Sequence, residues 1–261
     1  LAKWTQVTLH LGSGINHSCH HVKAHKIPAD EVLENPQLLH NTQFKKNTRR
    51  EMKSGMRPPE CDYCWRIEDN TKQYSDRVWK SGNVWSWPDY HKIVNSDPSV
   101  DFYPRYVEVS FSNVCNFKCS YCGPAFSSKW TEEIKQEGPY TFSKANWNYN
   151  KPDPNELQIP ERDDNPYIEA FWKWFPEAVK HMHTFRITGG EPLLSKHTDR
   201  VIQHLIDNPQ PNLEFSINSN ACPPGKLWNK FVKKIKVLTE NKSIKQFTLH
   251  VSAEAKGAQQ E

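Results

Sequence analysis

Three cysteines lie within eight residues of one another, in the segment Cys115-Asn-Phe-Lys-Cys119-Ser-Tyr-Cys122. The segment follows directly after a strand-like run at 106–111. Three thiolates are one ligand fewer than a closed zinc site or a fully protein-bound cubane cluster requires. A cluster on these residues would keep one iron open to a ligand from outside the protein, which indicates chemistry more than scaffolding. A structural zinc site is the alternative, but no fourth ligand lies at a suitable spacing, and the soft ligand set favours iron and sulfide.

Small and polar residues also follow three later strand-like runs, at 184–188, 213–217 and 246–252. These residues form the motifs Gly189-Gly190-Glu191-Pro, Asn218-Ser-Asn220 and Ser252-Ala-Glu254. Paired glycines allow positive φ and let a ligand approach the backbone, and the carboxylate of Glu191 suits an ammonium group. Short amides can bond ribose hydroxyls or a carboxylate. Each motif alone is an ordinary turn, but four successive strands that end in such groups indicate one shared site.

Helix-like segments alternate with these strands, and the alternation predicts parallel strands with helical crossovers. The expected helices lie at 126–137, 167–182, 197–207 and 226–240. We therefore expect an α/β fold that forms a barrel or partial barrel, with its ligand site at the carboxyl ends of the strands. Residues 138–165, rich in Pro, Asn and Asp, are expected to form a surface insertion. The chain is expected to be a fragment whose remaining barrel strands are missing.

The first hundred residues have a different pattern and are expected to form a small, mostly helical module. Domains are thus predicted at 1–100 and 101–261. Within the first, Cys61-Asp-Tyr-Cys64 follows Gly55, and Cys19 lies upstream beside His20 and His21. A redox pair is disfavoured because no βαβ pattern surrounds it. Half of a zinc site completed by His20, His21 or His25 and a second iron–sulfur cluster both fit these ligands.

Bulk composition narrows the classes of function. Hydrophobic residues make up 36% of the chain and aromatic residues 12%, with a net charge of +4. No run of about 20 apolar residues and no signal peptide is visible, so we expect a cytoplasmic protein without a membrane partner. Seven cysteines in that compartment favour metal ligands over disulfides. No long basic run is present, which makes a nucleic-acid partner unlikely.

The cysteine triplet with Tyr121 before its last cysteine, followed by the Gly-Gly-Glu-Pro, Asn-Ser-Asn and Ser-X-Glu motifs, resembles the radical S-adenosylmethionine (radical SAM) superfamily over about 103–254. The resemblance implies a partial (β/α)6 TIM-like barrel, here truncated after about four strands. It also implies a [4Fe–4S] cluster on Cys115, Cys119 and Cys122, whose open iron binds S-adenosylmethionine through its amino and carboxylate groups. Reductive cleavage would give methionine and a 5′-deoxyadenosyl radical that abstracts hydrogen from the substrate. The family pattern has Asp more often where this chain has Glu254, which puts the role of Glu254 in doubt.

The same resemblance assigns roles around the cofactor. Gly189, Gly190 and Glu191 would hold its amino group, and Asn218 or Asn220 would lie near the ribose or carboxylate. The rim would be completed by Ser252 and Glu254, with Tyr121 near the adenine. The amino-terminal segment, with Asn35-Pro36, Asn41 and Gly55 between its cysteines, resembles the twitch or SPASM-type module that binds an auxiliary cluster. That module usually follows the barrel, whereas here it precedes it.

These resemblances imply a radical SAM enzyme with a peptide, protein or small-molecule substrate and a reductant such as flavodoxin or ferredoxin. The cofactors would carry the difficult chemistry, while the protein orients and shields them. The alternative from another class is a non-catalytic module that binds zinc at both cysteine groups and serves an interaction.

Overall fold

The computed structural model describes residues 1–138, 158–160 and 164–253 of the chain. Within these ranges, seven strands are hydrogen-bonded in the order β3-β2-β1-β4-β5-β6-β7. Their bounds are β1 (Gln6–His10), β2 (Ile15–His17), β3 (His25–Lys26), β4 (Tyr106–Ser110), β5 (Thr184–Thr188), β6 (Gln210–Ser219) and β7 (Ile244–Val251).

Most of this sheet is parallel, as the alternation of helices and strands predicts. Between β1 and β4, the Arg105 amide donates to the Thr5 carbonyl and the Leu11 amide donates to the Ser110 carbonyl, each at 2.8 Å. The residue numbers rise together on the two strands, so the strands run in the same direction. β6 and β7 are also parallel, while β2 and β3 form an antiparallel pair. The predicted α/β fold is confirmed; closure into a partial barrel stays a prediction.

The α-helices have the following bounds: α1 (Ala2–Thr5), α2 (Ala29–Val32), α3 (Gln43–Lys53), α4 (Asp62–Asn70), α5 (Asp76–Ser81), α6 (Tyr90–Asn95), α7 (Ser128–Glu137), α9 (Pro166–Ala178), α10 (Lys196–Asp207) and α11 (Gly225–Glu240). Short 3₁₀ turns are η1 (Pro36–Leu39), η2 (Pro59–Cys61), η3 (Trp87–Asp89), η5 (Val179–His181) and η6 (Pro192–Leu194).

The regular structure of the first hundred residues is mostly helical, but β1, β2 and β3 also join the sheet next to β4, which the sequence did not indicate. Residues 28–40 do not form one helix, because Pro36 lacks a backbone N–H to continue α2 and begins η1 instead, with Asn35 as its N-cap. Most of the predicted insertion at 138–165 lies outside the described residues.

The chain divides into two compact units. Unit 1 comprises residues 1–9, 14–108 and 164–184, and unit 2 comprises 10–13, 109–163 and 185–261. Helix α9 groups with the amino-terminal residues in this division, and the predicted domain boundary at residue 100 stays a prediction.

The core of unit 1 forms around β1 and α9. Val7 and Leu9 of β1 are fully buried, as are Phe171 and Phe175 of α9. The two phenylalanine rings are stacked with centroids 5.0 Å apart. α9 begins at Asn165, whose side-chain oxygen accepts from two amides of the first turn, as an N-cap residue does.

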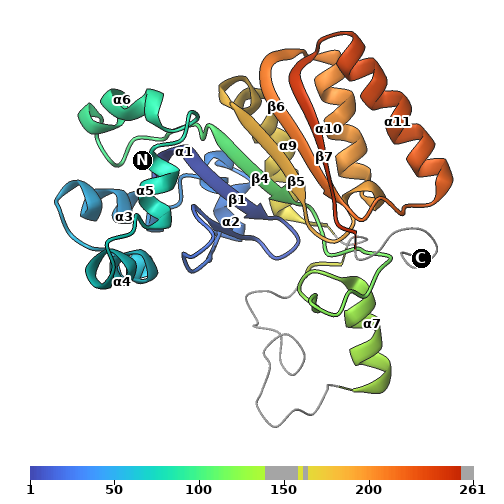
Figure 1. The fold of residues 1–261 in the computed structure, drawn as a ribbon, viewed down its shortest axis with the longest axis horizontal. Coiled ribbons are helices and arrows are strands. Elements are labelled where there is room, and N and C mark those ends of the chain that lie inside the picture. The colour runs from blue at the N-terminus through green and yellow to red at the C-terminus, as the bar shows by residue number, and fades with distance from the viewer. Residues whose placement is uncertain (139–157, 161–163, 254–261) are drawn as a thin grey trace. The chain divides into compact units, whose positions relative to one another are not determined.

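The core of unit 2 lies between its strands and the helices α10 and α11, which run side by side along β6 and β7 (Figure 1). α10 buries Val201, Ile202 and Leu205, spaced as one face of a helix requires. In the strands, Phe185 and Phe215 stack with centroids 5.8 Å apart. These buried contacts hold β5 and β6 together, so the loops at their carboxyl ends start from fixed positions.

Candidate functional site

The three central cysteines open onto a single pocket of about 200 Å³ in unit 2. Its lining comes from the loop after β4 and from the carboxyl ends of β5, β6 and β7, as expected for ligand sites in parallel α/β folds. The residues that line it are Cys115, Phe117, Cys119, Tyr121, Cys122, Phe126, Thr188, Gly189, Gly190, Asn218, Ser219, Asn220 and Ser252. The structure therefore brings the predicted cysteines together with most of the residues predicted to surround them.

The cysteine loop is anchored by the start of α7. The Cys115 amide donates to the Ser128 hydroxyl at 3.1 Å, and the Ser127 hydroxyl donates to the Phe117 carbonyl at 2.7 Å. Farther along α7, the indole of Trp130 donates to the Cys119 carbonyl at 3.0 Å. These bonds fix the backbone of the loop, so its thiols do not depend on a metal for their approximate position.

The thiols influence one another electrostatically. Burial raises the pKa of Cys115 and of Cys122 above the ordinary value, and the neighbouring thiols of the triplet raise both further. In the metal-free protein these groups are therefore neutral at pH 7. Binding of a cationic cluster would release their protons, because thiolates are the ligating form.

Gly189 and Gly190 are required by the loop that follows β4. A Cβ on Gly190 would lie 2.2 Å from the Val114 carbonyl oxygen, and Gly189 has φ +121°, a conformation that L-residues rarely adopt. The Gly190 amide also donates to the Ser112 carbonyl at 3.2 Å. The glycines thus let the end of β5 pack directly on the backbone that leads into the cysteine loop.

The Glu191 carboxylate has internal partners. It accepts hydrogen bonds from the Leu193 amide at 3.0 Å, the Ser219 hydroxyl at 2.7 Å and the Asn220 amide at 2.7 Å. The residue is only 2% exposed and is not among those that line the pocket with the cysteines. In this structure Glu191 ties the end of β5 to the end of β6.

Two asparagines connect β6 to the cysteine loop. Asn220 donates from its side chain to the Asn116 side chain at 3.0 Å, and Asn116 donates to the Cys222 carbonyl at 2.7 Å. Asn218 accepts from Arg186 at 3.0 Å. Asn116 was not predicted, and its only sequence signal is a position inside the cysteine triplet.

Of the remaining predicted residues, two line the pocket and one lies outside the described residues. The Ser252 amide donates to the Ser219 carbonyl at 2.9 Å, and Ser252 lines the pocket. Tyr121 also lines it and is 65% exposed, so its ring is accessible to a planar ligand. Glu254 lies outside the described residues.

The amino-terminal cysteines lie together in unit 1. Cys19, Cys61 and Cys64 are all buried, at 3%, 3% and 2% exposure. Burial raises the pKa of Cys19 to about 12, and the thiols of Cys61 and Cys64 raise it further by smaller amounts. By contrast, His20 and His21 are exposed on the surface, where His21 stacks on Tyr63. The three thiols are therefore buried near one another, while these two histidines lie at the surface.

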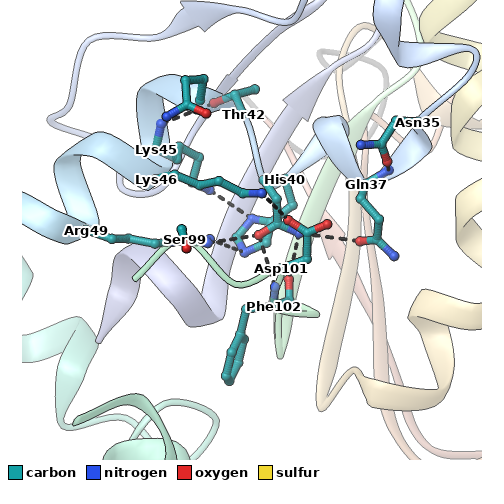
Figure 2. Close-up of polar contacts among 12 residues, drawn as sticks. Asn35, Gln37, His40, Thr42, Lys45, Lys46, Arg49, Ser99, Asp101 and Phe102 are labelled. Atoms are coloured by element: carbon teal, nitrogen blue, oxygen red, sulfur yellow. Dashed lines mark hydrogen bonds and ion pairs between the residues drawn. The ribbon is translucent and has the colours of Figure 1, made fainter. Parts of the chain in front are cut away.

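Close to these thiols lies a buried group of cations that the sequence did not indicate, composed of Lys3, Lys45 and Arg49 (Figure 2 shows the two on α3). Lys45 contacts His40 Nδ1 at 2.8 Å through its Nζ. Arg49 donates to the Asn41 side chain at 2.9 Å and to the Lys3 carbonyl at 3.0 Å. Charged residues on an amphipathic helix are usually solvated, which is why sequence alone gives no reason to expect them inside.

Both cysteine groups have features that suit a cluster. The central thiols share one open pocket, and the hydroxyl of Ser18, next to Cys19, is buried without a hydrogen-bond partner. Among the described residues, no three His, Cys, Asp or Glu side chains form a group that could hold a single metal ion. A cubane binds each thiolate at a different iron, so its ligands need not surround one point.

Comparison with known proteins finds relatives that match about half of this chain. The chain is 28% identical over 132 residues to the radical SAM cyclopropyl synthase TigE of Paramaledivibacter caminithermalis, which covers 50% of this chain and 25% of that protein. It is 29% identical over 121 residues to the GTP 3′,8-cyclase of Pasteurella multocida, covering 45% and 28%. It is also 28% identical over 131 residues to the GTP 3′,8-cyclase of Aliarcobacter butzleri, covering 50% and 30%.

The matched part thus spans about a quarter to a third of these curated relatives. No family model matches the sequence. No solved structure matches it either. The similarities support a relationship to radical SAM enzymes. Within the described ranges, each helix falls short of the length or hydrophobicity that a bilayer crossing needs.

Proposed function

We propose that this chain carries the cofactor site of a radical SAM enzyme, with a [4Fe–4S] cluster on Cys115, Cys119 and Cys122. The observation that supports this most strongly is the shared pocket, in which the three thiols face the ends of β5, β6 and β7. When bound, the cluster and S-adenosylmethionine would supply an electron and a strongly oxidising organic radical. Hydrogen abstraction from a substrate is the reaction that these groups support.

The residues of the chain position and shield these groups. Gly189 and Gly190 offer backbone at the pocket wall, where an amino group can be bound by carbonyl oxygens, and Asn218 and Ser252 line the opposite rim. Glu191 contributes from outside the pocket, because its carboxylate accepts a hydrogen bond from the Asn220 amide and so fixes Asn220 at that rim. Tyr121 would cover the adenine. We assign Glu254 to the same rim on the sequence resemblance alone.

We further propose that Cys19, Cys61 and Cys64 hold a second, auxiliary iron–sulfur cluster in a module of the twitch or SPASM type. Their joint burial and mutual electrostatic influence support a shared ligand. The substrate that we propose is a peptide or protein, and the electron donor is a flavodoxin or ferredoxin in the cytoplasm. Substrate assignment rests on analogy with enzymes that carry auxiliary clusters, since fold does not identify a substrate.

The cofactor reaction is directly testable. The protein is reconstituted with iron and sulfide without oxygen, then given dithionite and S-adenosylmethionine, and 5′-deoxyadenosine is quantified. We expect product from the wild type and from Cys222→Ala, whose thiol lies beside this site without belonging to the triplet. The triple variant Cys115→Ala, Cys119→Ala, Cys122→Ala should give none.

Two outcomes would reject the proposal. One is equal 5′-deoxyadenosine from the wild type and the triple variant. The other is a colourless protein, purified without oxygen, that contains about one zinc per cysteine group, which would establish the non-catalytic zinc module instead.

A further inference from the structure

The buried cations of unit 1 lack the negative charge that such groups need. Lys45 is 1% exposed and Arg49 is 0% exposed. The hydrogen-bond partners of Lys45 are the Gln6 carbonyl at 3.4 Å and His40 at 2.8 Å, and those of Arg49 are likewise uncharged. Within the described residues, neither side chain forms an ion pair. An isolated buried cation destabilises the folded state, because the charge loses its hydration without gaining an anionic partner.

The two carboxylates that act on Lys45 and Arg49 already have partners, and a further one, Asp76, lies near Cys19. Glu60 pairs with Lys3, the third buried cation, with side chains 7% and 4% exposed. Asp101 lies near Arg49 but pairs with Lys46 at 2.6 Å. Three buried cations therefore share one buried carboxylate, and the charge of this region is not balanced by acidic side chains.

The three thiols are a further source of negative charge close to these cations. Lys3 pairs with Glu60, the neighbour of Cys61, and Ala2, the neighbour of Lys3, packs with Cys19 in one buried cluster. Burial, Arg49 and Lys3 lower the pKa of Lys45 well below its ordinary value, while Glu60 and Cys19 act in the opposite direction. Burial raises the pKa of Cys19 and of Cys61, and Lys3 lowers both by a smaller amount. Cations and thiols are thus close enough to influence one another. Three thiolates around a cluster would bring the anionic charge that the metal-free protein lacks.

We propose that Lys45 and Arg49, together with Lys3, form a buried counter-charge for a thiolate-bound cluster at Cys19, Cys61 and Cys64. This inference rests on the auxiliary cluster proposed above. It makes these cations positioning residues for the cluster: they favour its loading and raise its reduction potential, because added electron density is stabilised by nearby positive charge. Binding of the cluster would then also stabilise the folded state of unit 1, because it supplies the negative charge that the buried cations need.

The test isolates the second cluster. In the background Cys115→Ala, Cys119→Ala, Cys122→Ala, the amino-terminal trio is the one proposed cluster site that remains, and Lys45→Met is added to it. The metal-free Lys45→Met protein should melt at the same or a higher temperature, because a buried charge has been replaced by an apolar chain of similar size. The loaded protein should show the reverse: a smaller gain in melting temperature on loading and a more negative cluster potential in a spectroelectrochemical titration.

Two further variants sharpen the comparison. Lys45→Gln removes the charge but keeps polar contacts to Gln6 and His40, so it should shift the potential in the same direction even if Lys45→Met folds poorly. Lys46→Met is the matched control, since its partly exposed ammonium is paired with Asp101, and it should leave the potential unchanged.

The outcomes separate the two proposals. A background protein without iron–sulfur absorption would reject the auxiliary cluster and the counter-charge together, while product formation by the wild type would leave the central site standing. A background protein that holds a cluster, but whose potential and loading-dependent melting are the same with and without Lys45, would overturn the counter-charge alone.

Discussion

At the scale of single residues, the site depends on groups whose role is to fix other groups. Glu191 illustrates this, because the sequence suggests a carboxylate for an ammonium, while the structure gives its two oxygens three donors from the protein. Two of those donors are backbone amides at the ends of different segments. A buried acceptor set of this kind decides where the rim of the pocket lies.

Glu191→Gln is therefore expected to destabilise unit 2. The amide can turn either way, but its NH₂ group must then face the amide of Leu193 or of Asn220, so one donor loses its acceptor. The expected loss is about 1–3 kcal/mol in the free energy of unfolding, measured by urea denaturation of the metal-free protein. Glu240→Gln, an exposed control on α11, should change it little; equal stability of the wild type and Glu191→Gln would contradict the bonding described.

Gly190→Ala should be more damaging than its single methyl group suggests. The new Cβ would lie 2.2 Å from the Val114 carbonyl oxygen and 2.7 Å from the backbone of Asn113, and backbone cannot move aside as a flexible side chain can. We expect a loss of about 1–3 kcal/mol, as for other overpacked sites, and poorer cluster loading. Gly225→Ala is the control, because a Cβ there meets nothing within 4 Å; a similar melting temperature for the two variants would argue against the close approach.

At the scale of elements, the cysteine loop is held between α7 and the loop that follows β6. Serine hydroxyls of the first turn of α7 hold its backbone on one side. Asn116 and Asn220 join it to β6 on the other. The loop is therefore positioned by two elements that lie far from each other in sequence, about a hundred residues apart.

Asn116→Ala should loosen this connection without removing a ligand. The Cys222 carbonyl would lose its donor at 2.7 Å, and the Asn220 amide group would lose its acceptor. We expect normal folding, with faster loss of iron to a chelator and a weaker change in the reduced cluster's electron paramagnetic resonance spectrum when S-adenosylmethionine is added. The exposed Asn241→Ala provides the comparison, and identical iron retention in both variants would show that the bridge does not matter.

At the scale of the whole molecule, buried histidines link stability to pH. Burial lowers the pKa of His25 to about 3, with smaller effects from Lys45, Lys3 and His17, and burial likewise lowers that of His40 well below its ordinary value. In unit 2, burial lowers the pKa of His197 to about 4, helped by Lys196 and Arg200. Each of these rings is held neutral in the folded chain.

Stability should accordingly fall as the solution becomes acidic. The unfolded chain binds protons at these histidines near pH 6.5, whereas the folded chain does not until their lowered values are reached. Their contribution is thus complete above pH 6.5 and declines below it, by at most about 1.4 kcal/mol per pH unit for each ring. Melting temperatures of the metal-free protein between pH 7.5 and 5 measure this slope.

His25→Gln supplies the matched test of that slope. Glutamine can keep the contact that His25 makes with the Thr42 hydroxyl at 2.7 Å, but it does not titrate. The variant should lose less stability than the wild type between pH 7 and 5, while the exposed His91→Gln should follow the wild type. A slope unchanged by His25→Gln would mean that this ring is accessible to protons in the folded chain.

The sequence by itself determined the local features: the cysteine triplet, the glycine pair, and the four carboxyl-terminal strands, of which β5 was predicted at its observed bounds. Such features depend on spacing and on hydrophobic runs, which are properties of neighbouring residues. Only the tertiary structure decided that Glu191 turns inward, that Asn116 bridges to β6 and that β1–β3 join the sheet. It alone also decided that Lys45 and Arg49 are buried, because burial of a charged helix residue is set by what packs on the helix and not by the helix sequence.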